Sequence, residues 1–153
     1  MKLYLAHPLE LRKQVREKEL EFERETEINL VNPFYDTERS DIKNIDSGLI
    51  SREDSSLDYN GIVLHDLSLI DNSDGIIAYL DNVRMVGTVC EMWHALTIGK
   101  PVYIIDKNNG HVWVRYIAEK SYGKTFTNWE EIIEFFRSPG KSFVNNIRNK
   151  VRK

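Results

Sequence analysis

Cysteine is nearly absent from this sequence, because Cys90 stands alone among 153 residues. A single cysteine cannot close a disulfide within the chain, and without a cluster of cysteine and histidine it offers no zinc site of ordinary spacing. Long apolar runs are absent too, since nowhere do about eighteen apolar residues follow one another as in a membrane-spanning helix. The apolar stretch at residues 3–6 is too short for a secretory signal. We therefore expect a protein of the reducing cytoplasm that does not enter a membrane.

Positive charge is not in excess. Lys and Arg contribute 21 side chains and Asp and Glu contribute 24, so the formal net charge is −3. This sign is unsuited to coating phosphate backbones, and we do not expect binding to a nucleic acid polymer. Gly123-Lys124-Thr125 resembles the end of a P-loop, but Ala118 stands where that motif needs a glycine. No G-x-G-x-x-G motif occurs, so a dinucleotide site has no support.

The sequence does contain a regular alternation of two patterns. Short apolar runs typical of buried strands occur at residues 3–6, 28–31, 75–80, 101–105 and 125–126. Helical patterns separate them at residues 9–26, 62–70, 87–98 and 111–120, and a last helix is preceded by a capping-box pattern, Thr127 to Glu130. The length suits one domain over residues 1–153. We predict an α/β fold, a single-domain, doubly wound parallel sheet of five strands with helices on both faces, flavodoxin-like or Rossmann-like.

Residues 34–60 interrupt this alternation. Asp, Ser, Glu, Arg and Asn dominate there, and the few apolar residues follow no sustained period. We expect a long loop, which could contain a helical turn. Loops of this length inside compact domains tend to be lids or binding segments, so we interpret this one as a loop or lid over a site.

Chemistry is expected where the strands end. In a parallel sheet, ligands bind beyond the carboxyl ends of the strands, near the start of the helix that begins at Gly87. We expect Glu91 in the first turn of that helix, where the helix dipole favours an anion and an ionised carboxylate can attack an electrophilic carbon. Thr88 and Glu91 also fit a capping box, in which the glutamate only closes the helix end. The spacing alone leaves both interpretations open.

The same helix raises the question of a subunit contact. The stripe that we expect to pack on the sheet is Val89, Met92, Trp93 and Leu96. The opposite face is small and partly apolar, and consists of Gly87, Glu91, His94, Ala95 and Ile98. A helix covered on both sides would place a subunit interface near Glu91. The alternative is an ordinary surface with one exposed isoleucine.

Three short motifs carry a resemblance to a known family. They are Tyr4-Leu5-Ala6-His7-Pro8, Asn72-Ser73-Asp74-Gly75, and Gly87-Thr88-x-x-Glu91 with Ala95 and Gly99-Lys100-Pro101 behind it. In this order and spacing, over residues 2–106, the sequence resembles the nucleoside 2-deoxyribosyltransferase family. The relatives of that family include N-glycosidases that hydrolyse nucleoside 5′-monophosphates.

The resemblance implies a covalent mechanism that needs no metal or organic cofactor. Glu91 would be the nucleophile that forms a deoxyribosyl-enzyme intermediate, Asp74 would handle the proton of the base, and Tyr4 would orient the glutamate. This scheme is chemically coherent, because cleavage of an N-glycosidic bond creates an oxocarbenium-like centre that a carboxylate stabilises and traps. A second carboxyl group of higher pKa must protonate the departing base. Without the resemblance, Asp74 is a turn residue and Tyr4 an ordinary strand aromatic.

The motifs also imply residues that bind the substrate. These are Ala6, His7, Gly87 and Thr88, together with Asp81, Asn82 and Arg84. Met85 stands where the transferases commonly carry an aspartate that contacts the sugar, and its three polar neighbours could substitute for it. Arg84 could instead hold a 5′-phosphate by a forked contact, or be a solvated loop residue. His7 could touch sugar or phosphate, or cap the following helix, and the Gly-rich phosphate loop of the monophosphate hydrolases is missing here.

We therefore expect a homo-oligomeric enzyme whose substrate is a small nucleoside or nucleotide and whose active sites lie near subunit contacts. Transfer of a deoxyribosyl group between bases is the first hypothesis for its function. Hydrolysis of deoxynucleoside or nucleoside 5′-monophosphates is the alternative. A non-catalytic nucleotide-binding or sensor module, in which Met85 marks lost chemistry, is the second alternative.

Overall fold

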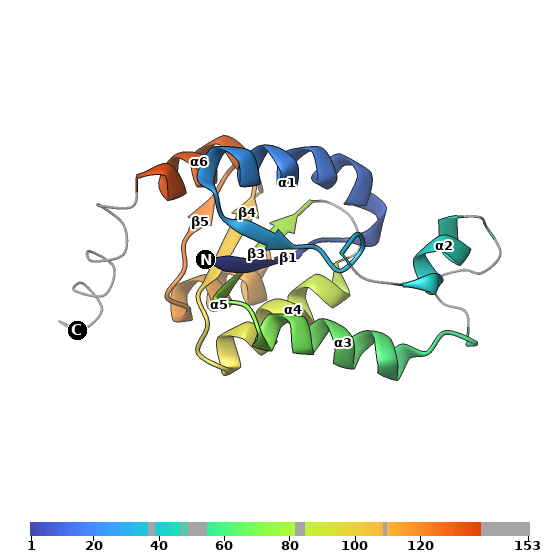
Figure 1. Ribbon diagram of the computed structural model, residues 1–153. Coiled ribbons are helices and arrows are strands. Elements are labelled where there is room, and N and C mark those ends of the chain that lie inside the picture. The colour runs from blue at the N-terminus through green and yellow to red at the C-terminus, as the bar shows by residue number, and fades with distance from the viewer. Residues whose placement is uncertain (37–38, 47, 49–54, 82–84, 109, 139–153) are drawn as a thin grey trace.

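Five parallel strands form the centre of the structure, a computed structural model that describes residues 1–36, 39–46, 48, 55–81, 85–108 and 110–138. The strands lie in the order β2-β1-β3-β4-β5 (Figure 1). Their bounds are β1 Lys2–Ala6, β2 Asn29–Val31, β3 Gly75–Leu80, β4 Val102–Asp106 and β5 Thr125–Phe126. Every neighbouring pair is parallel, which confirms the predicted fold class. This strand order reverses direction between β1 and β3, the point at which such sheets bind ligands.

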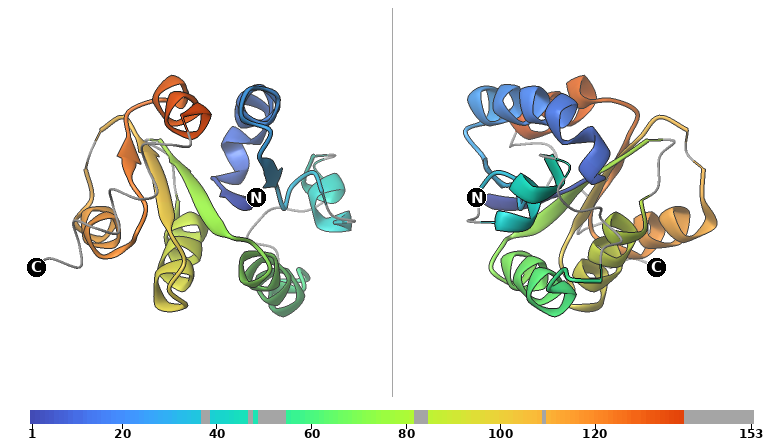
Figure 2. Two further views of the ribbon diagram at one scale, coloured as in Figure 1. Left: turned by 60° about the vertical axis from the view of Figure 1, so that its left-hand side comes forward. Right: turned by 90° about the vertical axis from the view of Figure 1, so that its right-hand side faces the viewer.

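Helices cover both faces of the sheet (Figure 2). One layer is formed by α1 (Arg12–Thr26), which follows the short 3₁₀ turn η1 (Leu9–Leu11), and by α6 (Trp129–Arg137). The other layer is formed by α3 (Tyr59–Asp71), α4 (Val86–Thr97) and α5 (Val112–Lys120). The short helix α2 (Ser40–Asp46) lies apart from both layers, to the side of the sheet (Figure 1).

Each layer encloses its own apolar cluster, and the residues of a strand alternate between the two. Leu3 and Leu5 of β1 join the cluster beneath α1 and α6, whereas Tyr4 and Ala6 join the cluster beneath α3, α4 and α5. Because both faces are covered, both sets of side chains are apolar, and the strands appear in the sequence as continuous hydrophobic runs. Tyr4 is fully buried and carries a hydroxyl group into the second layer.

Several helix ends differ from the sequence-based expectation. Helix α3 begins at Tyr59, three residues early, because the side chain of Asp58 accepts a hydrogen bond from the Gly61 amide at 2.9 Å. The capping box of α6 lies one residue later than predicted. Its N-cap is Asn128, which accepts from the Glu131 amide at 2.9 Å, and the Glu131 carboxylate accepts from the Thr127 amide at 2.9 Å.

Helix α4 packs on the sheet through a different stripe from the one predicted. Thr88, Met92 and Ala95 are buried, whereas Trp93 is 41% exposed. The expectation was therefore correct for Met92 and for Leu96, which packs against the cluster beneath α4, and wrong for Trp93 and Ala95. The small alanine side chain fits close against the sheet, and the large indole is left on the outer side.

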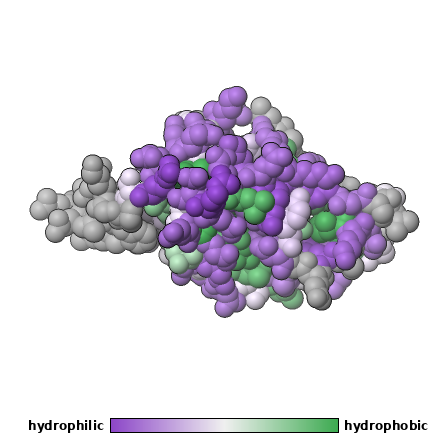
Figure 3. Space-filling model, turned by 45° about the horizontal axis from the view of Figure 1, so that its top comes forward, coloured by the Kyte–Doolittle hydropathy of each residue, from purple (hydrophilic) through white to green (hydrophobic). Residues whose placement is uncertain are grey.

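The outer surface above α1 is strongly hydrophilic. Figure 3 shows mainly polar and charged residues on the side of the molecule where α1 and α6 lie in Figure 1. This agrees with the dense charge of α1, whose buried residues are limited to Val15, Glu19 and Phe22. Within the described ranges, no helix combines the length and the apolar character needed to cross a membrane.

Candidate active site

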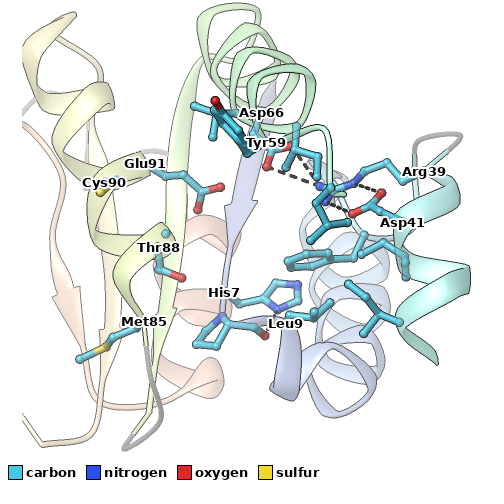
Figure 4. A pocket seen from close by; sticks show the side chains of 18 of the residues that line it. His7, Leu9, Arg39, Asp41, Tyr59, Asp66, Met85, Thr88, Cys90 and Glu91 are labelled. Carbon is cyan, nitrogen blue, oxygen red and sulfur yellow. Dashed lines mark hydrogen bonds and ion pairs between the residues drawn. The ribbon is translucent and has the colours of Figure 1, made fainter. Parts of the chain in front are cut away.

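A cavity of about 470 Å³ opens where β1 ends and α4 begins (Figure 4). His7 follows β1 into one wall, and Gly87, Thr88 and Glu91 of α4 form another. The remaining walls come from α3 and from the segment that contains α2. The cavity therefore lies at the reversal point between β1 and β3, as the strand order requires.

Glu91 is held at the cavity by a buried tyrosine. The hydroxyl of Tyr4 donates a hydrogen bond to Oε1 of Glu91 at 2.6 Å. Burial, followed by the charges of Glu91 and Asp66, raises the pKa of Tyr4 well above its ordinary value, so the phenol stays protonated and remains a donor. The strand thus supplies a rigid support for a carboxylate that Figure 4 shows directed into the cavity.

The position of Glu91 in α4 decides between the two interpretations of the Thr88–Glu91 spacing. The N-cap of α4 is Met85, and the helix begins at Val86. Thr88 is therefore inside the first turn rather than at the N-cap, and Glu91 lies in the second turn rather than the first. A capping box requires the threonine at the N-cap, so the helix end does not account for this glutamate.

Asp66 supplies a second carboxyl group to the same cavity. Figure 4 shows it reaching into the cavity from α3, on the side that faces Glu91. Its carboxyl lies 3.4 and 3.5 Å from Nη1 of Arg39. Burial raises the pKa of Asp66, and the Arg39 guanidinium opposes that rise. A raised pKa favours the protonated carboxyl, which is the form that donates a proton.

Asp66 was not among the residues predicted from the sequence, although its position carries a signal. On a helix, Asp66 shares a face with Ile62, Val63 and Ile70, which are three or four residues away. An acid in the middle of an apolar stripe is buried when the helix packs, and a buried acid needs a partner or a function. The apolar positions were used to predict the helix, and the acid among them was passed over.

Asp74 does not belong to this site, and the prediction that it handles the proton of the base is wrong. It precedes β3, at the amino end of the sheet, whereas the cavity lies at the carboxyl end. Its carboxylate accepts a hydrogen bond from the Lys2 amide at 2.7 Å, and its own amide donates to the Lys2 carbonyl at 2.7 Å. Asp74 therefore pins the start of β3 to the start of β1.

The other expected substrate-binding residues fall into three groups. His7, Gly87 and Thr88 line the cavity, as does Met85, and thus stay candidates. Ala6 and Asp81 are described but do not line it, since Ala6 packs in the core at the end of β1 and Asp81 directly follows β3. Asn82 and Arg84 lie outside the described residues.

His7 is almost fully buried in the cavity wall. Nδ1 lies 3.0 Å from the Pro8 carbonyl oxygen and Nε2 lies 3.4 Å from Oδ1 of Asn32. Burial lowers the pKa of His7 to about 4, so the imidazole is uncharged at neutral pH. It therefore brings no positive charge to the cavity.

The site thus combines a positioned carboxylate with a second carboxyl group of raised pKa. This pair can stabilise and trap a cationic carbon and can protonate a leaving group. The described part of the chain contains no group of three His, Cys, Asp or Glu side chains arranged to hold a metal ion.

Solved structures share this fold. The 2-deoxyribosyltransferase of the psychrotolerant bacterium Bacillus psychrosaccharolyticus is 20% identical over 95% of this chain and 96% of its own, with a TM-score of 0.62. The CMP N-glycosidase BcmB of Clostridium botulinum is 16% identical over 88% of this chain and 95% of its own, with a TM-score of 0.56. No family model matches the sequence, and no curated protein matches it. The fold implied by the sequence motifs is thereby confirmed, and the chain has the fold of 2-deoxyribosyltransferases and related N-glycosidases.

Proposed function

We propose that this protein cleaves the N-glycosidic bond of a 2′-deoxynucleoside and transfers the deoxyribosyl group to another base. The observation that carries the proposal is the Tyr4–Glu91 hydrogen bond of 2.6 Å on the wall of a cavity that also contains the Asp66 carboxyl. One structural neighbour is a 2-deoxyribosyltransferase and the other is a CMP N-glycosidase, which supports an enzyme of this kind.

In the proposed mechanism, Glu91 attacks C1′ of the sugar while Asp66 protonates the base. The C1′–N bond breaks, its electron pair goes to the base nitrogen, and a covalent bond forms between C1′ and a carboxylate oxygen of Glu91. An acceptor base then attacks C1′, releases Glu91 and gives up its proton to the Asp66 carboxylate. Tyr4 donates to Oε1 of Glu91 throughout and fixes the rotamer of the nucleophile. Asp66 takes the role that the sequence had assigned to Asp74.

Hydrolysis of deoxynucleoside or nucleoside 5′-monophosphates is the second candidate, and the likeness to a CMP N-glycosidase favours it. In that case water replaces the acceptor base at C1′, and the same two carboxyl groups act. The products separate the two reactions, because transfer gives a new nucleoside and hydrolysis gives free base and a sugar phosphate.

The test is incubation of the protein with 2′-deoxynucleosides and with their 5′-monophosphates, with and without a different free base, followed by chromatography. Exchanged nucleoside that depends on the acceptor base supports transfer, and release of base without exchange supports hydrolysis. Both activities should be lost in Glu91→Ala and in Asp66→Asn. They should be retained in Glu17→Gln, which changes an exposed position on α1. Tight binding of a nucleoside without turnover would instead support the non-catalytic module.

We also propose that the protein is a homo-oligomer, because an aromatic cluster lies exposed on α4 and α5. Trp93, Trp113 and Tyr116 are 41%, 52% and 48% exposed. The ring centroid of Trp93 lies 5.5 Å from that of Trp113 and 6.3 Å from that of Tyr116. A contiguous exposed apolar patch commonly marks an interaction site, and the partner that we propose is a second copy of this chain.

A further inference from the structure

The charged side chains that line the cavity are predominantly acidic. Among the described residues, Asp41, Asp66 and Glu91 supply three carboxyl groups, and Arg39 supplies one guanidinium. The Arg39 contact lowers the pKa of Asp41, which keeps that carboxylate charged. Even with Asp66 protonated, as the proposed mechanism requires, the carboxylates of Asp41 and Glu91 outnumber the Arg39 guanidinium, and this excess opposes a ligand that brings further negative charge.

The guanidinium of Arg39 is already engaged by two of these carboxyl groups. Its Nη2 donates to Oδ2 of Asp41 at 2.6 Å, and its Nε donates to Oδ1 of Asp41 at 3.0 Å. Nη1 is directed to the Asp66 carboxyl, and the guanidinium carbon lies 5.7 Å from the centroid of the Phe34 ring. A phosphate binds arginine through the same two-pronged arrangement of N–H groups that Asp41 occupies here.

The end of β1 offers little to an anion. Pro8 has no backbone N–H, and the uncharged ring of His7 is held between the Pro8 carbonyl and Asn32. The guanidinium of Arg12, the next basic side chain, pairs with Asp46 of α2. The amino end of α4 contributes the equivalent of about half a positive charge, which does not offset the surplus of carboxylates.

From this arrangement we infer that the cavity accepts uncharged nucleosides and rejects their 5′-monophosphates, and that Asp41 determines this selectivity by holding Arg39. The inference rests on the proposed function, because it names the substrate class for the same site. It adds a role for Asp41, which takes no part in the bond-breaking step. Asp41 is a specificity residue, since its carboxylate both adds negative charge and withholds the guanidinium from a phosphate.

The experiment compares kcat/KM for one 2′-deoxynucleoside and for its 5′-monophosphate in the wild type, Asp41→Asn and Glu17→Gln. The wild type should prefer the nucleoside by about tenfold or more. Asp41→Asn removes one negative charge and releases the fork of Arg39, so its activity on the monophosphate should rise and the preference should shrink by about tenfold. Glu17→Gln makes the same charge change outside the cavity and should leave the ratio as in the wild type.

Two results would overturn the inference. One is a wild-type preference for the monophosphate, and its loss in Arg84→Gln would identify the cation responsible. The other is a ratio in Asp41→Asn equal to that in Glu17→Gln. If no variant releases base from either compound, the proposed function has failed. In that case, calorimetric titration with the same two compounds still tests the selectivity. The inference predicts that the nucleoside binds and that the monophosphate does not.

Discussion

At the scale of single residues, the site depends on a hydrogen bond between a residue of β1 and a residue of α4. Tyr4 packs in the buried apolar cluster beneath α4, and its hydroxyl donates a hydrogen bond to Glu91. A hydrogen bond to a charged group typically contributes about 1.5–3 kcal/mol, and here it fixes the orientation of the nucleophile. The geometry therefore assigns to Tyr4 a positioning role whose loss should affect the chemical step.

Replacing Tyr4 with Phe should lower kcat by about ten- to a hundredfold with little change in KM, because the hydroxyl orients Glu91 and the ring keeps the packing. Steady-state kinetics would measure this split. Tyr103→Phe is the matched control, since Tyr103 is also buried but faces the layer of α1 and α6. Equal kcat values in the two variants would show that the Tyr4 hydroxyl does not position the nucleophile.

The role of Asp66 predicts a shift in the pH dependence of activity. As a proton donor, Asp66 acts in its protonated form, so kcat/KM should fall as pH rises through its pKa. Arg39 holds that pKa down, against burial. In Arg39→Met the pKa of Asp66 should rise further, and the falling limb of the profile should move to higher pH.

The matched control for this profile is Arg137→Met, which removes a surface guanidinium paired with Glu25. Its falling limb should coincide with that of the wild type. A limb that stays in place or moves to lower pH in Arg39→Met would rule out Asp66 as the group that titrates.

At the scale of elements, the sequence predicted the strands well because both faces of the sheet are covered. Continuous apolar runs identified all five strands, and the motif around Gly87 identified Glu91. The choice of Asp74 failed because a residue before a parallel strand lies at the opposite edge from the residues that follow it. Asp66 was missed although it stands among the apolar positions of α3, because that pattern was used only to predict the helix and not the burial of the acid within it.

The exposure of Trp93 has the same origin. Helical periodicity predicted that Trp93 packs on the sheet, but the buried residues of α4 are Thr88, Met92 and Ala95. Hydrophobicity predicts which face of a helix is buried only where the helix has one apolar face and packs against one neighbour. On a helix that is apolar nearly all round, close approach to the sheet favours the smaller side chains.

Gly123 shows how an element boundary can depend on one residue without a side chain. A Cβ at this position would lie 1.9 Å from the Val102 carbonyl oxygen, which is far inside any permitted contact. Gly123→Ala should therefore shift the chain between α5 and β5 and destabilise the protein by about 2 kcal/mol or more. The glycine that resembles part of a P-loop thus has a packing role.

Chemical unfolding would measure this loss. Gly110→Ala serves as the control, because a Cβ there would meet its nearest neighbour, the Asn108 carbonyl oxygen, at an ordinary 3.6 Å. Its free energy of unfolding should stay within about 0.5 kcal/mol of the wild type. A similarly small effect in Gly123→Ala would mean that the strand β4 yields easily at Val102.

At the scale of the whole molecule, the exposed aromatic cluster on α4 and α5 has a testable consequence for assembly. Trp93→Gln should weaken the association of subunits, because it removes the side chain that both Trp113 and Tyr116 contact. Light scattering coupled to size exclusion would report the mass of the wild type and the variant over a range of concentrations. Leu20→Gln, a similarly exposed apolar position on α1, should leave the mass unchanged. A monomeric wild type would contradict the proposed homo-oligomer.

A buried polar network joins α1, β2 and the cavity wall, and its two titratable members respond to pH in opposite directions. Nδ2 of Asn32 donates to Oε2 of Glu19 at 2.7 Å, and Oδ1 of Asn32 lies 3.4 Å from Nε2 of His7. Burial raises the pKa of Glu19 to about 7 and lowers that of His7 to about 4. The folded state therefore favours the neutral form of each side chain.

Because of these pKa shifts, the stabilities of the variants Glu19→Gln and His7→Gln should diverge as the pH changes. The contribution of Glu19 is present below its ordinary pKa of 4.5 and is lost as pH rises toward 7, whereas that of His7 is present above 6.5 and is lost as pH falls toward 4. In the wild type the two trends oppose each other between these limits. Relative to the wild type, the free energy of unfolding of Glu19→Gln should increase with pH over this window, and that of His7→Gln should decrease, each by about 1–3 kcal/mol. Urea unfolding followed by circular dichroism at several pH values would show the divergence, and variants that both run parallel to the wild type would show that neither group titrates differently in the folded protein.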